Sequence, residues 1–300
     1  MERVERPTGH PFQPLLRLTV LGPWTFIRRW PVIPAIVLTT LIVVGAFAPL
    51  LVRHDPYKGK ILDAYLPPAW SAEGSMKYPL GTDHVGRDIL SRIIQGARLD
   101  LMVVSISLFA GFLVGSTIGI VAGYLGGWWD EVIMRLVDVW YSVPYMMIAL
   151  VVVILFGQSF GMVMGLLMLF SWVGFVRVTR ANTLSIKSAD YIALARVAGA
   201  SHARILVRHI VPMVVSSAVV LATLNVGGLI LLEGTLSFIG VGIPSPNPAW
   251  GTMIAEGRAY IHMYWWISFF PGVAMFLVVM SLNFMGDWLR DRLDPRLRQL

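Results

Sequence analysis

The sequence predicts an all-α membrane protein with six transmembrane helices. Of its 300 residues, 56% are hydrophobic and only 14% are charged, whereas ordinary soluble domains carry about 25% charged residues. A helix needs about 20 mostly apolar residues to cross a bilayer. Five stretches without Asp, Glu, Lys or Arg reach that length, at residues 30–52, 101–129, 139–176, 211–232 and 259–286.

The spans follow from these stretches in chain order. The first apolar run begins too far from residue 1 to be the apolar region of a cleaved signal peptide. We therefore expect residues 1–30 to form a cytoplasmic N-terminal arm. A first span at 31–52 leads into an extracytoplasmic loop at 53–100. The run 139–176 is too long for one span and is broken at 157–161 by glycines and polar residues, which favour a turn. The core at 101–286 therefore holds spans at 101–124, 136–156, 161–180, 212–233 and 266–286, with a cytoplasmic loop at 181–211 and a cytoplasmic tail at 287–300.

Smaller features refine this arrangement. In the loop 53–100, Thr82 or Asp83 is placed to cap an amphipathic helix whose apolar stripe includes Val85, Ile89 and Ile93. Pro144 predicts a kink in the third span. The stretch 234–255 is uncharged but rich in proline and glycine, and we interpret it as a loop or re-entrant segment. In the second span, one row of glycines favours close contact with a neighbouring helix: Gly111, Gly115, Gly119 and Gly123.

The distribution of basic residues predicts the orientation. With both termini inside, the cytoplasmic segments hold 16 of the 24 Lys and Arg residues. This topology accounts for the net charge of +7 better than nucleic-acid binding does. The absence of cysteine excludes a disulfide framework and thiolate metal sites. We therefore expect a multi-pass protein of the cell membrane, with the lipid bilayer and not nucleic acid as a partner.

One charged segment between apolar runs has a distinct pattern. A short helix with an apolar face is predicted from Asp190 to Ala198, formed by Tyr191, Leu194, Ala195 and Ala198. Gly199 suits the left-handed position that ends a helix. Ser201 is placed to cap a second, basic helix at 202–210, which carries Arg204 and Arg208 one turn apart. Pro212 then opens the next apolar run.

This segment resembles the cytoplasmic loop of ABC importer permeases. Their signature reads Glu-Ala-Ala, three residues, Gly, nine residues, Ile, one residue, Leu-Pro, and the matching positions here are Ala193, Leu194, Ala195, Gly199, His209, Val211 and Pro212. Ala193 replaces the leading acidic residue. The looser pattern of the dipeptide and oligopeptide branch is closer, carried by Tyr191, Ala195, Arg196, Gly199, Ala200, Arg208, His209 and Pro212.

A second segment resembles the same branch, through Leu80-Gly81-Thr82-Asp83, Gly86-Arg87-Asp88 and Ser91-Arg92. The likeness extends from about Trp30 to Arg296. Two interpretations of this segment stay open: a helix on the outer membrane surface, or an outer gate that contacts a solute-binding protein. Glu233, at the end of the predicted fifth span, is either solvated or functional. The outer candidates are Asp83, Arg87, Asp88, Glu233 and Ser237.

The resemblance implies a type I ABC importer permease for di- or oligopeptides. It further implies a second related permease, two ATPase subunits and an external binding protein, with ATP and Mg bound by the partners and no cofactor in this chain. The residues implied in ATPase coupling are Asp190, Tyr191, Ala193, Ala195, Arg196, Gly199, Ala200, Arg204, Arg208, His209 and Pro212. Nickel chelates, glutathione or another small solute are alternative cargoes, and a basic helix that only fixes topology is the alternative for the loop.

Enzymatic signals are weak. The sequence contains no Gly-Lys-Ser/Thr phosphate loop and no His-Glu-x-x-His, and its histidines lack metal-ligand spacing. Residues 157–161 match Gly-x-Ser-x-Gly, but predicted membrane spans flank them where a nucleophile elbow needs a strand and a helix. An intramembrane enzyme with Ser159 as nucleophile and His84 or His262 as base remains a remote alternative. A secondary transporter is another, although we find no inverted repeat and no charge at mid-membrane.

Overall fold

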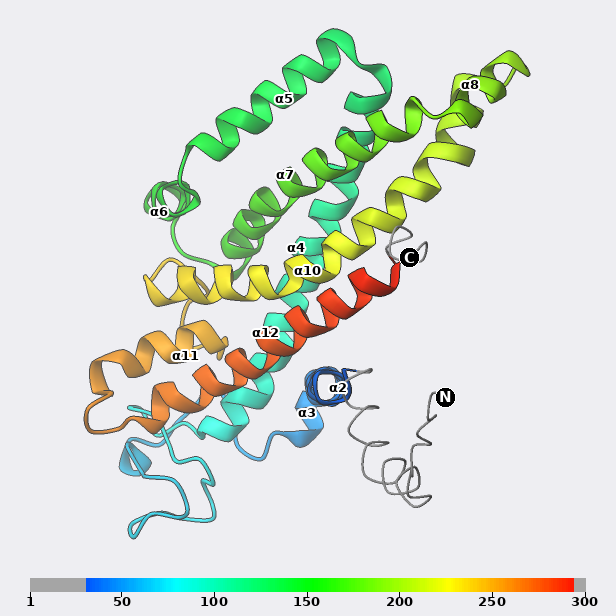
Figure 1. The fold of residues 1–300 in the computed structure, drawn as a ribbon. Helices are drawn as coiled ribbons and strands as arrows, with labels where there is room; N and C mark the ends of the chain where they lie inside the picture. The colour runs from blue at the N-terminus through cyan, green and yellow to red at the C-terminus, as the bar shows by residue number, and fades with distance from the viewer. Residues whose placement is uncertain (1–30, 294–300) are drawn as a thin grey trace, which may run out of the picture.

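The computed structural model describes residues 31–293, so the predicted N-terminal arm and residues 294–300 of the predicted tail lie outside the described residues. The described chain is helical, and its only β-type pairing is an isolated bridge between Thr82 and Asp88 (Figure 1). Its α-helices are α2 (Val32–Ala46), α3 (Ala48–Leu51), α4 (Ile89–Leu125), α5 (Gly127–Ser142), α6 (Tyr145–Phe156), α7 (Phe160–Lys187), α8 (Asp190–Val197), α9 (His202–Ile205), α10 (Val211–Phe238), α11 (Trp250–Gly257) and α12 (Trp266–Leu293). Short 3₁₀ segments lie at Ile61–Asp63 (η1) and Arg258–Tyr260 (η3), and a π-helical turn lies at Leu206–Ile210 (η2).

Within residues 31–293, four helices are long and apolar enough to cross a membrane: α4, α7, the continuous helix His202–Phe238 and α12. The bent pair of α5 and α6 makes a fifth if it counts as one span. The first apolar run forms only the 15-residue α2, because the helix is interrupted at Phe47. Fifteen residues are fewer than the about 20 that a span needs. The all-α fold is thus confirmed, whereas the count of six spans stays a prediction.

The predicted third span is divided by Pro144. Proline disfavours helical geometry in the residue before it, and Val143 is accordingly extended at φ −99° and ψ 124°. Helix α5 therefore ends at Ser142, and α6 leaves at an angle of 81° to it. The turn expected at 157–161 is confirmed, since Gly157 has φ 81° and the Ser159 hydroxyl accepts the Met162 N–H at the start of α7. This role as a helix cap explains Ser159 without any catalytic function.

Helices α4 and α7 pack closely along the predicted row of glycines. A Cβ atom at Gly111 would lie 2.0 Å from the Ser171 Oγ, and one at Gly115 would lie 2.2 Å from the Trp172 carbonyl oxygen. Gly119 and Gly123 likewise face α7. The two helices approach at distances that no larger residue allows, which confirms that this row serves helix packing.

The basic helix predicted at 202–210 and the span predicted at 212–233 form one continuous helix. The join passes through η2, where the Val211 N–H bonds to the Leu206 carbonyl five residues earlier. Proline lacks an N–H and its ring clashes with the carbonyl four residues before it, so the wider π turn accommodates Pro212 without ending the helix.

The segment predicted as a loop or re-entrant stretch contains α11, eight residues long and packed against α10 and α12. Trp250 is buried, and a Cβ atom at Gly251 would lie 2.6 Å from the Gly234 Cα. Helix α11 is thus an internal element and too short to be a seventh span. In Figure 1, α11 and the loop before α4 lie at one end of the molecule and α8 lies at the other.

Candidate functional site

Helix α8 and the turn after it have the geometry that the sequence predicted. The helix runs from Asp190 to Val197, and Gly199 follows it with φ 80°. The Ser201 hydroxyl accepts the Arg204 N–H as the cap of α9. Since left-handed φ values are nearly free of cost only for glycine, this turn depends on Gly199.

A small apolar cluster attaches α8 to the body of the protein. Ile192 is fully buried against Ile120 of α4 and against Ile205, Ile210 and Val214 of the α9–α10 helix. Burial of one such side chain contributes roughly 1.5–3 kcal/mol. The cluster therefore holds α8 on two long helices at once.

Most of the apolar face predicted for α8 is exposed, although the Tyr191 side chain also touches Met213. Tyr191, Leu194 and Val197 are 42%, 69% and 88% exposed, and Ala193 and Ala198 are exposed as well. A short helix at the end of the molecule thus presents a contiguous apolar surface outward, which is typical of an interaction site.

The other predicted coupling residues lie on α8 itself and on the turn and helix that follow it. Exposed among them are Asp190, Arg196, Gly199, Arg204, Arg208 and Pro212, whereas Ala195, Ala200 and His209 are partly buried. The Tyr191 hydroxyl lies 3.1 Å from the Met213 sulfur, next to Pro212. With three exposed arginines against one exposed aspartate, α8 and the segment after it carry a net positive charge.

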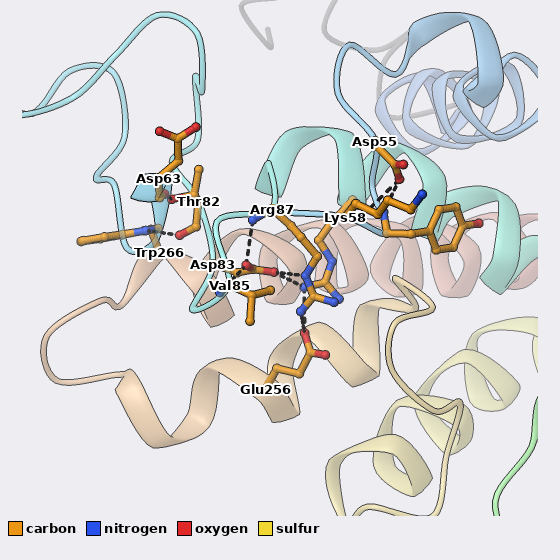
Figure 2. A network of polar contacts seen from close by, with 11 residues as sticks. Asp55, Lys58, Asp63, Thr82, Asp83, Val85, Arg87, Glu256 and Trp266 are labelled. Carbon is orange, nitrogen blue, oxygen red and sulfur yellow. Dashed lines mark hydrogen bonds and ion pairs between the residues drawn. The ribbon is translucent and has the colours of Figure 1, made fainter. Parts of the chain in front are cut away.

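At the opposite end of the molecule, three buried charged side chains and one partly buried carboxylate form one network (Figure 2). The Arg87 Nε donates to the Asp83 Oδ2 at 2.6 Å, and its Nη2 donates to the Glu256 Oε2 at 3.0 Å. The Arg92 Nη1 donates to the same two carboxylates, at 2.7 Å to Glu256. Each charge therefore has partners of opposite sign, as burial requires.

Asp83 and Arg87 were predicted from the sequence as site residues, but Arg92 and Glu256 were not. Arg92 and Glu256 are 164 residues apart, and no local spacing indicates such a pairing. The signal available for Arg92 was its place in the Ser91-Arg92 pair of the second resembling segment. This network fastens α11, which carries Glu256, to the start of α4.

The network also sets the ionisation of its acids. Burial raises the pKa of the Asp83 carboxyl, but the guanidinium groups of Arg92 and Arg87 lower it by more than this, so that the pKa lies below its ordinary value. The pKa of Glu256 is likewise raised by burial and lowered more strongly by Arg92 and Arg87, so that it lies below normal. Both carboxylates are thus held ionised by their arginine partners.

Asp83, His84 and Glu256 have potential ligand atoms within 4.8 Å of one another. The facing oxygens of the two acids already accept hydrogen bonds from Arg87 and Arg92. A divalent cation there would meet two guanidinium charges at hydrogen-bond distance from its ligands. The chemistry of this cluster therefore fits a salt-bridge network and not a metal centre.

The helix start predicted at Thr82 or Asp83 is wrong. Asp88 caps α4 by accepting the Ser91 N–H at 3.1 Å, and Thr82 and Asp83 lie in the loop before it. Gly86 has φ 82°, which is incompatible with a helix through that position. The amphipathic helix expected on the membrane surface is the first part of the continuous α4, and Asp88 serves it as a structural residue.

Glu233 does not end its helix, because α10 continues to Phe238. Its side chain is 1% exposed and accepts a hydrogen bond from the Ser237 hydroxyl at 2.6 Å. The Ile243 N–H bonds to the same hydroxyl, and the carboxylate of Asp100 on α4 accepts the Trp250 N–H at 3.2 Å. The solvated interpretation of Glu233 is therefore wrong, and both acids lie where α10 and α4 meet the start of α11.

Comparison with known proteins identifies the architecture. Residues 115–299 match the family described as "Binding-protein-dependent transport system inner membrane component". The chain belongs to this family of ABC importer permeases.

Curated relatives align over most of the permease. It is 35% identical over 285 residues to the "Dipeptide transport system permease protein DppC" of Haemophilus influenzae, covering 92% of this chain and 94% of that protein. It is 42% identical over 219 residues to the "Glutathione transport system permease protein GsiD" of Pectobacterium atrosepticum, covering 73% of each chain. A "Di/tripeptide transport system permease protein DppC" from Pseudomonas aeruginosa is 36% identical over 86% of this chain and 85% of its own length.

A solved structure supports the same fold. A chain from "Inward facing conformations of the MetNI methionine ABC transporter" superposes with a TM-score of 0.57 at 16% identity, over 69% of this permease and 98% of that chain. The permease is therefore a multi-pass inner membrane protein with the type I importer fold, in a family of non-catalytic subunits. The family match includes both α8 and α11.

Proposed function

We propose that this permease passes di- or oligopeptides across the inner membrane, driven by ATPase partners that bind α8. Two of the relatives above are named for dipeptide or di/tripeptide transport, and one of these aligns over 94% of its own length. Glutathione, itself a small peptide, is the cargo named for another relative. Uptake of radiolabelled dipeptides by cells that depend on this system, with glutathione as competitor, tests the cargo: competition by glutathione and none by peptides would contradict it.

The observation that carries the coupling proposal is the division of α8 into two faces. Ile192 is buried against α4 and α10, while Tyr191, Leu194 and Val197 project outward. A helix with this division transmits a force: its outer face fits a groove on an ATPase, and its inner face moves the long helices. The exposed Arg196, Arg204 and Arg208 suit acidic residues of that ATPase or lipid headgroups.

The assembled importer then contains this permease, a second related permease, two ATPases that bind ATP and Mg, and an external binding protein. In the proposed orientation both termini and α8 face the cytoplasm, and the network of Asp83, Arg87, Arg92 and Glu256 lies outside. That network positions α11 at the outer end of the path, where the binding protein delivers its solute.

Leu194→Glu tests the docking of α8. A charge at the centre of the exposed apolar face should strongly reduce recovery of the ATPases with the tagged permease, while membrane abundance stays normal because the side chain makes little contact with the chain. Leu62→Glu is the matched control, since Leu62 is 98% exposed at the other end of the molecule. Equal recovery of the ATPases with both variants would contradict the proposal.

Labelling tests the orientation. The protein has no cysteine, so single cysteines introduced at the exposed positions Ser188 and Met76 report on one site each. An impermeant reagent added to intact spheroplasts should label position 76 and not position 188. Labelling of position 188 from outside would reverse the proposed topology and exclude a cytoplasmic ATPase at α8.

A further inference from the structure

The last turn of α4 is bonded to the segment that carries α8. The Tyr124 hydroxyl oxygen lies 2.8 Å from the His202 Nδ1, in a hydrogen bond between residues 78 positions apart. The two rings meet edge to face with centroids 6.0 Å apart. His202 is the first residue of α9, directly after the Ser201 cap. The end of α4 is thus fastened to the start of the helix that continues into α10.

Tyr124 is also bonded to α7. The Lys187 Nζ, in the last turn of α7, donates to the Tyr124 carbonyl oxygen at 2.5 Å. Carbonyl groups at a helix C-terminus have no partner within the helix, and a lysine there is favourable for the helix dipole as well. One residue of α4 therefore contacts both helical segments that flank α8, one through its backbone and one through its side chain.

The apolar contacts beneath Tyr124 do not fix a register by themselves. Ile120 packs against Ile192, Ile205 and other members of the same cluster, but apolar burial is non-directional and permits sliding. A hydrogen bond has a defined distance and angle. The Tyr124 hydroxyl also donates to the His202 carbonyl oxygen at 3.4 Å. The directional contacts between the ends of α4 and α9 are consequently the bonds of this one hydroxyl to His202.

We propose that Tyr124 is a positioning residue that makes α4 move together with the α8–α9 segment when the ATPases close. This inference rests on the proposed docking of the ATPases at α8. Helix α4 is continuous over 37 residues, and near its other end Arg92 and Asp100 hold α11 through Glu256 and Trp250. Movement at Tyr124 therefore reaches α11 along one rigid helix, in addition to the path through α10.

The experiment measures this joint movement directly and needs no knowledge of the cargo. Spin labels at cysteines introduced for the exposed residues Leu125 and Ala203 report the distance between the end of α4 and α9. The complete importer is reconstituted with its partner permease and ATPases, and distances are compared without nucleotide and with ATP plus vanadate. In the otherwise unchanged protein, the inter-label distance should stay the same in both states.

Tyr124→Phe keeps the ring and removes the hydroxyl. The loss of one net hydrogen bond should shift the ratio of joined to separated segments by about fivefold, so a second, longer distance should appear with ATP plus vanadate. His202→Ala keeps the backbone carbonyl oxygen that the Tyr124 hydroxyl reaches at 3.4 Å, so it should produce the longer distance in a smaller fraction, and the double variant should be no worse than Tyr124→Phe. Tyr141→Phe is the control, because Tyr141 is exposed on α5 and contacts Arg177 through its ring.

Several results would overturn the inference. If the inter-label distance changes with ATP plus vanadate in the protein that carries only the two labelled cysteines, α4 and α9 separate in normal function. An unchanged distribution in Tyr124→Phe, or independent addition of the two single effects, would mean that the hydrogen bond does not join them. Loss of the assembled complex in Tyr124→Phe would assign the hydroxyl to folding. Retained ATPase binding alongside either of the first two outcomes leaves the docking of α8 intact and separates the two proposals.

Discussion

The turn at Gly199 offers the sharpest test of the α8 site. Its φ of 80° lies in the left-handed region, and a Cβ atom added there would meet nothing within 4 Å. A substitution therefore acts through backbone conformation alone, without a steric clash. An L-residue in left-handed geometry costs roughly 1–2 kcal/mol, and a β-branched residue is worse still.

This strain acts against the contacts that hold α8 in place. Burial of Ile192 contributes roughly 1.5–3 kcal/mol, which is of the same size as the strain. In Gly199→Val, α8 should therefore detach from the Ile192 contacts in a fraction of the molecules and stay bound in the others. A change of 1–2 kcal/mol corresponds to a factor of about 5–30 in a population, so the affinity for the ATPases should fall by up to that factor and uptake should fall with it.

The assay is a titration of purified ATPase onto the permease in nanodiscs. Gly199→Asn should bind nearly as the unchanged protein does, because asparagine tolerates left-handed geometry. Gly228→Val provides a matched control, since Gly228 is an exposed helical glycine that also has open space around it. Equal affinities for Gly199→Val and Gly199→Asn would refute the argument from backbone strain. Full uptake by Gly199→Val with normal ATPase affinity would refute the role of the turn in coupling.

Gly115→Val should lower the melting temperature in detergent, at a cost of about 3 kcal/mol, because its Cβ would meet the Trp172 carbonyl, which is backbone and cannot rotate away. Gly165→Val, at a glycine of α7 with nothing within 4 Å, should cost much less. Glu256→Gln should destabilise the protein at pH 7 by about 3 kcal/mol, because it removes one of the two carboxylate charges that pair with the buried Arg92.

The last substitution also predicts a pH dependence. Glu256 has a pKa lowered below its ordinary value of 4.5, so it contributes stability above that value, and this contribution is lost as the pH falls through the lower folded-state pKa. The unchanged protein should therefore lose stability in acid more steeply than Glu256→Gln, as measured by melting temperature from pH 7 to pH 3. Parallel curves would contradict an ionised Glu256.

Equal melting temperatures for Gly115→Val and Gly165→Val would contradict the close packing of α4 on α7.

Some features followed from the sequence because they depend on local chemistry. The α8 helix, the glycine turn and the Ser201 cap arise from neighbouring residues whose backbone preferences and hydrogen bonds act within one or two turns. The glycine row in α4 was predictable for the same reason, since helical periodicity alone places such residues on one face. Hydropathy likewise indicated the long spans, because apolar length is a property of the sequence itself.

Other features depended on contacts between distant segments. Glu256 and Arg92 pair across 164 positions, Tyr124 and His202 across 78, and the burial of Glu233 needs α10 to continue beside α11. Local patterns also misplaced the start of α4, because Asp83 pairs with Arg87 and Arg92 and Asp88 caps the helix instead. The sequence by itself indicated the long apolar helices and the segment that resembles a coupling loop, but it did not indicate α11 as a helix. Only the tertiary structure decided which charges meet and which apolar face stays exposed, because both depend on the packing of helices and not on the order of residues within them.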